Sequence, residues 1–213
     1  MPSPEDILTG LETIAREWRW LAVLWHAYLA AGMLALVVGF RPSRRLAGAF
    51  LIAPLLSVAA LAWFQGNPFN GSVFTLSALI LGILAVRLPP EPVAPAARGW
   101  ILAGAALVAF GWFYPHFLGA ASWCSYLYAA PTGLIPCPTL AVVTGLSLAL
   151  GGLGSRSWYL TLAALGLFYG IFGAMRLGVR IDWVLSAGGV TALGAGLMMR
   201  TTPGKAAITG RVS

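Results

Sequence analysis

Charged residues are scarce in this chain. Asp, Glu, Lys and Arg make up only 9% of its 213 residues, whereas a soluble protein has about 25%. Apolar residues make up 59%, and such a composition cannot cover a surface that faces water. About 20 consecutive apolar residues cross a bilayer, so the scarcity of charge indicates a polytopic membrane protein whose solvent is lipid.

The motifs of the common enzyme classes are also missing. The chain has no Gly-x-Ser-x-Gly, no phosphate-binding loop and no His-Glu-x-x-His, and no paired carboxylates are placed for acid–base catalysis. No Asp, Glu, Lys or Arg falls well inside an apolar segment, whereas ion-coupled transporters place such groups at depth. We therefore do not expect an enzyme, unless the protein uses a bound cofactor.

The formal net charge of +7 does not indicate nucleic-acid binding. Basic residues occur singly or in small groups between the apolar segments, where they mark the cytoplasmic side of a membrane protein. Nine of the 13 lie in one set of loops and four in the other. This asymmetry predicts a multi-pass protein of the inner (plasma) membrane, with an extracytoplasmic N-terminus and a cytoplasmic C-terminus.

The lengths of the apolar segments predict an all-α fold, a transmembrane bundle of seven spans, or six if the short fifth segment does not cross. The predicted spans are Trp20–Phe40, Leu46–Phe64, Gly71–Leu88, Trp100–Leu118, Thr139–Gly154, Trp158–Met175 and Asp182–Met199.

The chain before the first span reads as an amphipathic helix. This helix is expected over residues 3–17. Ser3 can cap its start, Pro4 suits the first helical position, and apolar residues recur at helical spacing. We expect this helix to lie on the bilayer surface. The expected organisation is an interfacial segment over 1–19, one bundle over 20–199 with an extracytoplasmic loop at 114–138, and a cytoplasmic tail over 200–213.

The stretch from Tyr114 to Thr139 concentrates the unusual residues: both cysteines, one of the two histidines and several prolines. Within it, Ala129-Ala-Pro-Thr-Gly-Leu-Ile-Pro-Cys-Pro-Thr139 leads into an apolar segment. This part of the chain resembles a family of small bacterial integral membrane proteins of unknown function, which carry a Pro-Thr pair followed by Pro-Cys-Pro-Thr at the start of a helix. The resemblance implies a membrane architecture and directs attention to Pro136, Cys137, Pro138 and Thr139, but it implies no activity.

The Pro-Cys-Pro sequence restricts the backbone on both sides of one thiol and removes two N–H donors. Such a thiol, together with nearby imidazoles, could bind a soft metal ion such as copper, zinc or mercury. The candidate ligands are His116, Cys124 and Cys137 from the loop, with His26 from the first span.

Other interpretations of the same residues remain open. Cys124 and Cys137 could form a disulfide in an oxidising compartment or remain unbonded. His26 and His116 could ligate haem or border a quinone site, while a hydrogen bond between helices explains His26 more simply. For Asp182, which follows Arg176 and Arg180, the sequence favours a screened surface ion pair.

The leading functional prediction is therefore small-solute or soft-metal handling or transport, with Cys137 as the key residue and Cys124 and His116 assisting. The alternatives are a non-catalytic subunit or scaffold of a larger membrane complex and a haem- or quinone-binding protein. Besides the lipid bilayer, partners could include a second copy or a complex partner. They would bind through the small residues of the last two spans, although packing within the bundle explains these residues better.

Overall fold

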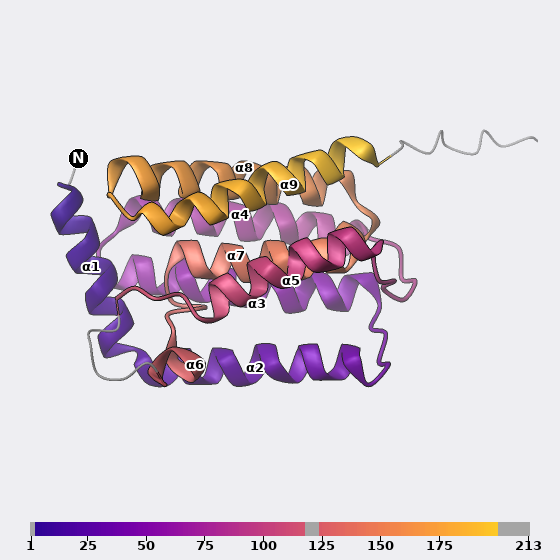
Figure 1. The fold of residues 1–213 in the computed structure, drawn as a ribbon, viewed down its shortest axis with the longest axis horizontal. Helices are drawn as coiled ribbons and strands as arrows, with labels where there is room; N and C mark the ends of the chain where they lie inside the picture. The colour runs from indigo at the N-terminus through magenta and orange to yellow at the C-terminus, as the bar shows by residue number, and fades with distance from the viewer. Residues whose placement is uncertain (1–2, 118–123, 200–213) are drawn as a thin grey trace, which may run out of the picture.

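The computed structural model describes residues 3–117 and 124–199, which form a bundle of helices running mostly along one axis (Figure 1). The predicted tail over 200–213 and part of the predicted loop lie outside the described residues. The helices are α1 (Pro4–Glu17), α2 (Arg19–Val37), α3 (Arg44–Phe64), α4 (Pro68–Arg87), α5 (Arg98–Trp112), α6 (Ser125–Ala129), α7 (Pro136–Ala149), α8 (Arg156–Ile171) and α9 (Trp183–Met198). Three short helical turns join the later ones: η1 (Gly151–Gly154), η2 (Phe172–Arg176) and η3 (Arg180–Asp182).

Five of the described segments are long and apolar enough to cross a membrane, which indicates a membrane protein. These are α2, α3, α4, and the segments Arg156–Arg176 and Arg180–Met198. The predicted fourth and fifth spans correspond to α5 and α7, which have 15 and 14 residues. Both are shorter than a typical transmembrane helix, because α5 ends at Trp112 rather than at Leu118 and η1 interrupts the chain after Ala149.

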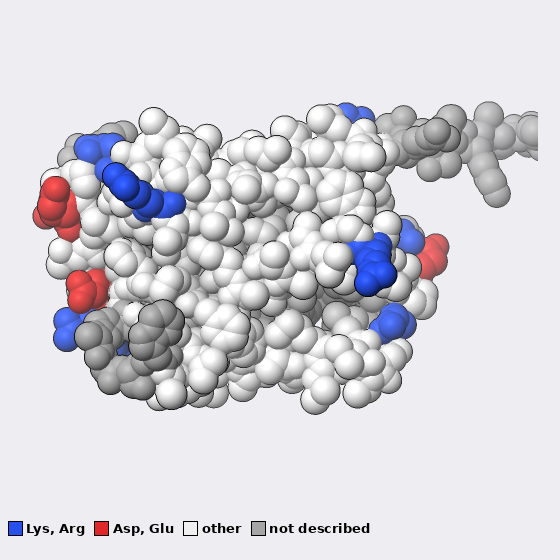
Figure 2. Space-filling view, in the orientation of Figure 1, with Lys and Arg blue, Asp and Glu red and all other residues white. Residues whose placement is uncertain are grey.

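Charged side chains gather at the two ends of the bundle and leave its flank uncharged (Figure 2). Helix α1 crosses one end, which we call the α1 end, and the loop between α2 and α3 marks the opposite end (Figure 1). Helix α1 begins at Pro4 because Ser3 accepts a hydrogen bond from the backbone N–H of Asp6, whose side chain accepts one from the N–H of Ser3.

Helix α7 is the centre of the bundle, with 12 of its 14 residues buried. Its backbone lies directly against that of α5 at Gly104 and Gly145. A Cβ atom on either glycine would collide with the carbonyl oxygen of the other. Two glycines at this crossing thus let the helix that carries the Pro-Cys-Pro-Thr motif sit deep in the fold.

The small residues of the last two spans are used within the molecule. Gly166 of α8 lies against Gly189 of α9, Gly188 packs on Leu107 of α5, and Gly196 packs on Tyr159. Close packing of α9 with α8 and with α5 therefore uses these small residues.

Candidate functional site

A buried non-helical segment leads into α7 at the α1 end. All residues from 130 to 136 are buried, and non-helical backbone at such depth requires partners within the protein. The hydroxyl of Thr132 joins the segment to α5 by donating to the carbonyl of Gly111 at 2.7 Å. Gly133 adopts a φ of +80° and lies under the indole of Trp25, where a Cβ would collide with the ring.

The threonine of the Pro-Cys-Pro-Thr motif fixes this segment to the helix. The Thr139 hydroxyl donates to the carbonyl of Ile135 at 2.6 Å and accepts from the N–H of Gly133 at 2.8 Å. Pro136 occupies the first helical position, where a missing N–H is not needed. The motif thereby sets the position of Cys137, whose half-buried side chain points to the site described next.

Cys137 lies beside a buried carboxyl group. Its thiol donates to Oδ2 of Asp182 at 3.1 Å, and the phenol of Tyr114 donates to Oδ1 of the same residue at 2.7 Å. Asp182 is 1% exposed. Gly173 in η2 makes room for the carboxyl group, since a Cβ there would collide with Oδ2.

The expected surface ion pair of Asp182 is wrong. The one ion pair of residues 3–117 and 124–199 joins Arg16 to Glu12, and the two hydrogen-bond donors to the Asp182 side chain are uncharged. Tyr114 lies outside every helix of the structure. Burial raises the pKa of its phenol well above the usual value, and Cys137 and Asp182 add to the effect. The phenol therefore stays protonated and donates.

A second buried polar pair lies nearby. The hydroxyl of Tyr169 in α8 donates to Oδ1 of Asn70 in α4 at 2.9 Å, and both side chains are buried. Asn70 is held in the first turn of α4, where its N–H donates to the side chain of Asn67.

The Asp182 group and the Tyr169–Asn70 pair border one cavity of about 160 Å³, which we call the outer cavity. Its polar wall contains Asp182, Tyr114, Cys137, Asn67, Asn70, Tyr169 and the basic Arg176. The rest is mostly apolar and comes from α1, the residues after α5, the start of α4, and η2: Ile7, Leu11, Phe69, Phe117, Phe172 and Leu177 are among the lining residues. The arrangement can bind a small molecule with an apolar body and one group that interacts with the carboxyl.

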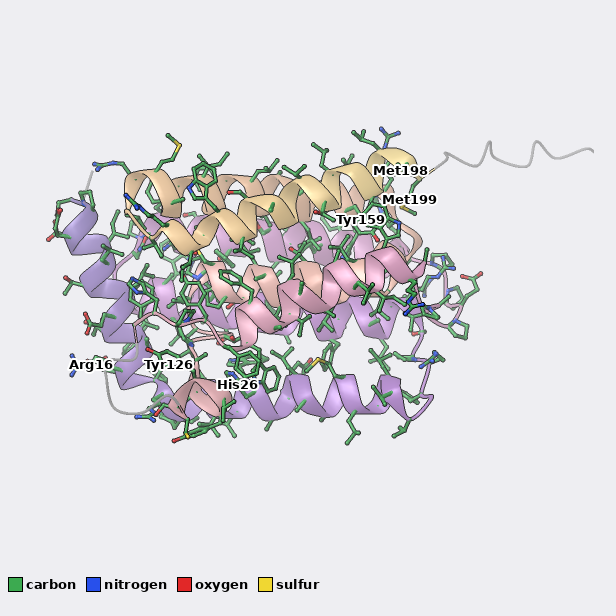
Figure 3. The ribbon with its side chains drawn as sticks, in the orientation of Figure 1. Arg16, His26, Tyr126, Tyr159, Met198 and Met199 are labelled. Atoms are coloured by element: carbon green, nitrogen blue, oxygen red, sulfur yellow. The ribbon has the colours of Figure 1, made fainter. Side chains whose placement is uncertain are left out.

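His26 lies away from this cavity, on the face of α2 turned toward the rest of the bundle (Figure 3). Its Nδ1 is 2.8 Å from the carbonyl oxygen of Ala22, and its Nε2 is 3.1 Å from that of Trp112 in α5. Both ring nitrogens thus face backbone carbonyls, which agrees with a hydrogen bond between helices.

His116 packs against Phe117, with 4.2 Å between the ring centroids. Burial lowers the pKa of its imidazole, and Glu12 opposes the shift. Cys124 is exposed at the start of α6, whereas the Cys137 thiol donates a hydrogen bond to Asp182.

The four predicted metal ligands are therefore distributed over different environments. Across the described ranges 3–117 and 124–199, no group of three or more His, Cys, Asp or Glu side chains is placed to hold a metal ion. Of the predicted site residues, the structure brings Cys137, with its flanking Pro136, to the outer cavity.

Sequence reasoning missed Tyr114, Tyr169, Asn70 and Asp182 as cavity residues. Their partners are 45 to 99 positions away in the chain, so no local pattern reveals them. The available signal was Asp182 itself, an acidic residue at the edge of an apolar segment.

Comparison of the chain with known protein families, curated proteins and solved structures finds no match.

Proposed function

We propose that this is a multi-pass protein of the inner membrane that binds a small cationic solute in the outer cavity, with the α1 end facing away from the cytoplasm. The orientation rests on the nine basic residues of one set of loops against four of the other. In this topology α1 is the interfacial helix, and its Ile7 and Leu11 close one side of the cavity.

The observation that carries this proposal is the environment of Asp182. A carboxylate removed from water is costly unless it is paired or hydrogen-bonded. Tyr114 donates a hydrogen bond to one oxygen of the carboxylate and Cys137 donates one to the other. A carboxylate can accept about four hydrogen bonds. Arg176 also lines the cavity, but in the described chain it makes no ion pair with Asp182. A protonated amine entering the cavity would supply the positive charge and the further donors that Asp182 lacks.

The remaining walls define the rest of the solute. Phe69, Phe117 and Phe172 surround the polar groups, so the solute's body is apolar. Asn70 and Tyr169 offer a second polar contact in this largely apolar wall. The substrate class is therefore a small organic amine, whose uptake or sensing from the extracytoplasmic side the protein would serve.

The soft-metal alternative has weaker support. Zinc and copper sites use three or four protein ligands, and in the described part of the chain Cys137 and Asp182 form a pair rather than a larger group.

Titration calorimetry tests the proposal with two probes of similar shape, benzylamine and the uncharged benzyl alcohol. Protein in nanodiscs is expected to bind benzylamine at least about tenfold more tightly, since a hydrogen bond to a charged group is worth about 1.5–3 kcal/mol. Asp182→Asn should remove this preference. Glu91→Gln is the matched control, because it removes an exposed acidic group at the opposite end.

Equal affinity of the wild-type protein for the two probes would contradict the proposal. So would an unchanged preference in Asp182→Asn.

A further inference from the structure

The second half of α2 has few buried residues. The buried residues of this helix are Ala22, His26 and Leu29, all in the part near the α1 end. Only 17% of its apolar segment is buried, compared with 56% for α3. In Figure 1, α2 forms the edge of the bundle along its whole length.

Two hollows flank this half of α2. One, of about 440 Å³, lies between α2 and α3, and the other, of about 600 Å³, lies between α2 and α5. Both reach α7 and share four lining residues: Met33, Leu36, Leu146 and Leu150. They are therefore two sides of one groove beneath α2, which we call the α2 groove.

The walls of the α2 groove are apolar. On the α3 side they include Phe40, Leu46 and Phe50, and the hydroxyl of Tyr28 there already donates to the carbonyl of Phe50 at 3.1 Å. Ordered water needs two to four polar partners, and these walls do not offer them. In a protein that spans a membrane, hydrocarbon chains of the surrounding lipid are the material available to fill such a space.

One charged side chain borders the groove. Arg41 lines its α5 side at the end away from α1. Its Nη1 donates to the carbonyl oxygens of Leu36 at 2.6 Å and Phe40 at 3.1 Å, which holds the guanidinium at the end of α2. A guanidinium has five N–H donors and binds phosphate well.

The charge around Arg41 points to an anionic ligand. In the described chain, the other charged residues at this end are mostly basic: Arg44, Arg45, Arg87, Arg98 and Arg156, with Glu91 the acidic exception. Figure 2 shows several basic groups and one acidic group at the right of the view, next to the uncharged flank. A phospholipid combines a phosphate group with apolar acyl chains. It therefore matches an apolar groove that ends at a basic surface.

We propose that the α2 groove is a binding site for one anionic phospholipid, with its acyl chains beside α2 and its headgroup at Arg41. The lipid comes from the leaflet that meets the basic end. It would complete the contact between α2 and α7 that protein side chains leave unfilled. This site is separate from the outer cavity and does not depend on the solute that binds there.

Native mass spectrometry of the detergent-purified protein tests the proposal with phosphatidylglycerol and phosphatidylcholine at equal concentration. The wild-type protein is expected to retain one phosphatidylglycerol about fivefold more strongly, given the contribution of one arginine near a lipid surface. Arg41→Gln should abolish this preference, while Arg156→Gln, which removes an exposed charge from the same end without lining the groove, should keep it.

A second pair of variants fills the groove. Ala105→Trp places an indole where an exposed alanine of α5 lines the wall, and it should reduce retention of both lipids at least about fivefold. Ala106→Trp is the control, because this neighbour is also exposed but does not line the groove. Equal lipid retention by Ala105→Trp and Ala106→Trp would overturn the site. Equal retention of the two lipids by the wild-type protein would overturn its anionic character.

Discussion

The outer cavity and the α2 groove are both bounded largely by apolar side chains, but they place their polar atoms differently. In the outer cavity a carboxyl group, a guanidinium, two phenols, a thiol and two amides contribute to the wall. In the α2 groove the one charged group stands at the edge. The first arrangement selects a ligand by the position of a charge, whereas the second accepts any flexible chain that carries its charge outside.

The two sites also differ in how firmly their walls are held. The outer cavity is bordered by the buried start of α7, which Thr139 joins to the preceding segment. The α2 groove lies under the least buried of the long helices. Substitutions at the outer cavity should therefore cost more stability than substitutions along the groove.

The largest effect is expected from Gly173→Ala. The added Cβ would collide with Oδ2 of Asp182, and the buried carboxyl group would have to move from its two donors. We expect a loss of about 2–3 kcal/mol in the free energy of unfolding, the upper range for overpacking a core. The measurement is the unfolding midpoint during titration with sodium dodecyl sulfate in mixed micelles.

Gly194→Ala provides the control, because no atom lies within 4 Å of the Cβ it would add. It should leave stability unchanged or raise it by up to about 1 kcal/mol through helix propensity. If both variants unfold at the same point, the close approach of Gly173 to Asp182 does not hold.

A smaller loss is expected from Thr139→Val. The substitution keeps the side-chain shape but leaves the buried N–H of Gly133 without its acceptor, which costs about 2 kcal/mol. Thr161→Val is matched to it, since Thr161 also donates to the carbonyl four residues earlier but is exposed, and it should change stability by less than about 0.5 kcal/mol. Equal losses in the same unfolding titration would show that Thr139 contributes only the local helix contact.

Sequence periodicity and apolar length were enough to predict a helical membrane bundle, because both are local properties of the chain. Helix α3 illustrates this, because it runs over residues 44–64 as one element although it contains Pro54. The motif around Cys137 was also recognisable, as proline on both sides of a thiol restricts the backbone wherever it occurs.

The partners of these residues could not be predicted. Asp182 seemed to belong with Arg176 and Arg180, its neighbours in the chain, but the fold turns its carboxyl group inward to Tyr114 and Cys137. Gly173 permits that arrangement because it has no Cβ to collide with the carboxyl group. Nothing in the sequence distinguishes Gly173 from the other 25 of the chain's 26 glycines.

Alkylation of the two cysteines tests the central claim most directly, because Cys137 borders the outer cavity and Cys124 is exposed elsewhere. Native membranes would be treated with N-ethylmaleimide, with and without benzylamine, and the modified peptides followed by mass spectrometry. The account predicts that Cys137 reacts without prior reduction and that benzylamine slows its reaction while leaving Cys124 unaffected. Reaction of Cys137 only after reduction would show a disulfide in place of the contact with Asp182, and an unchanged rate with benzylamine would contradict binding in the outer cavity.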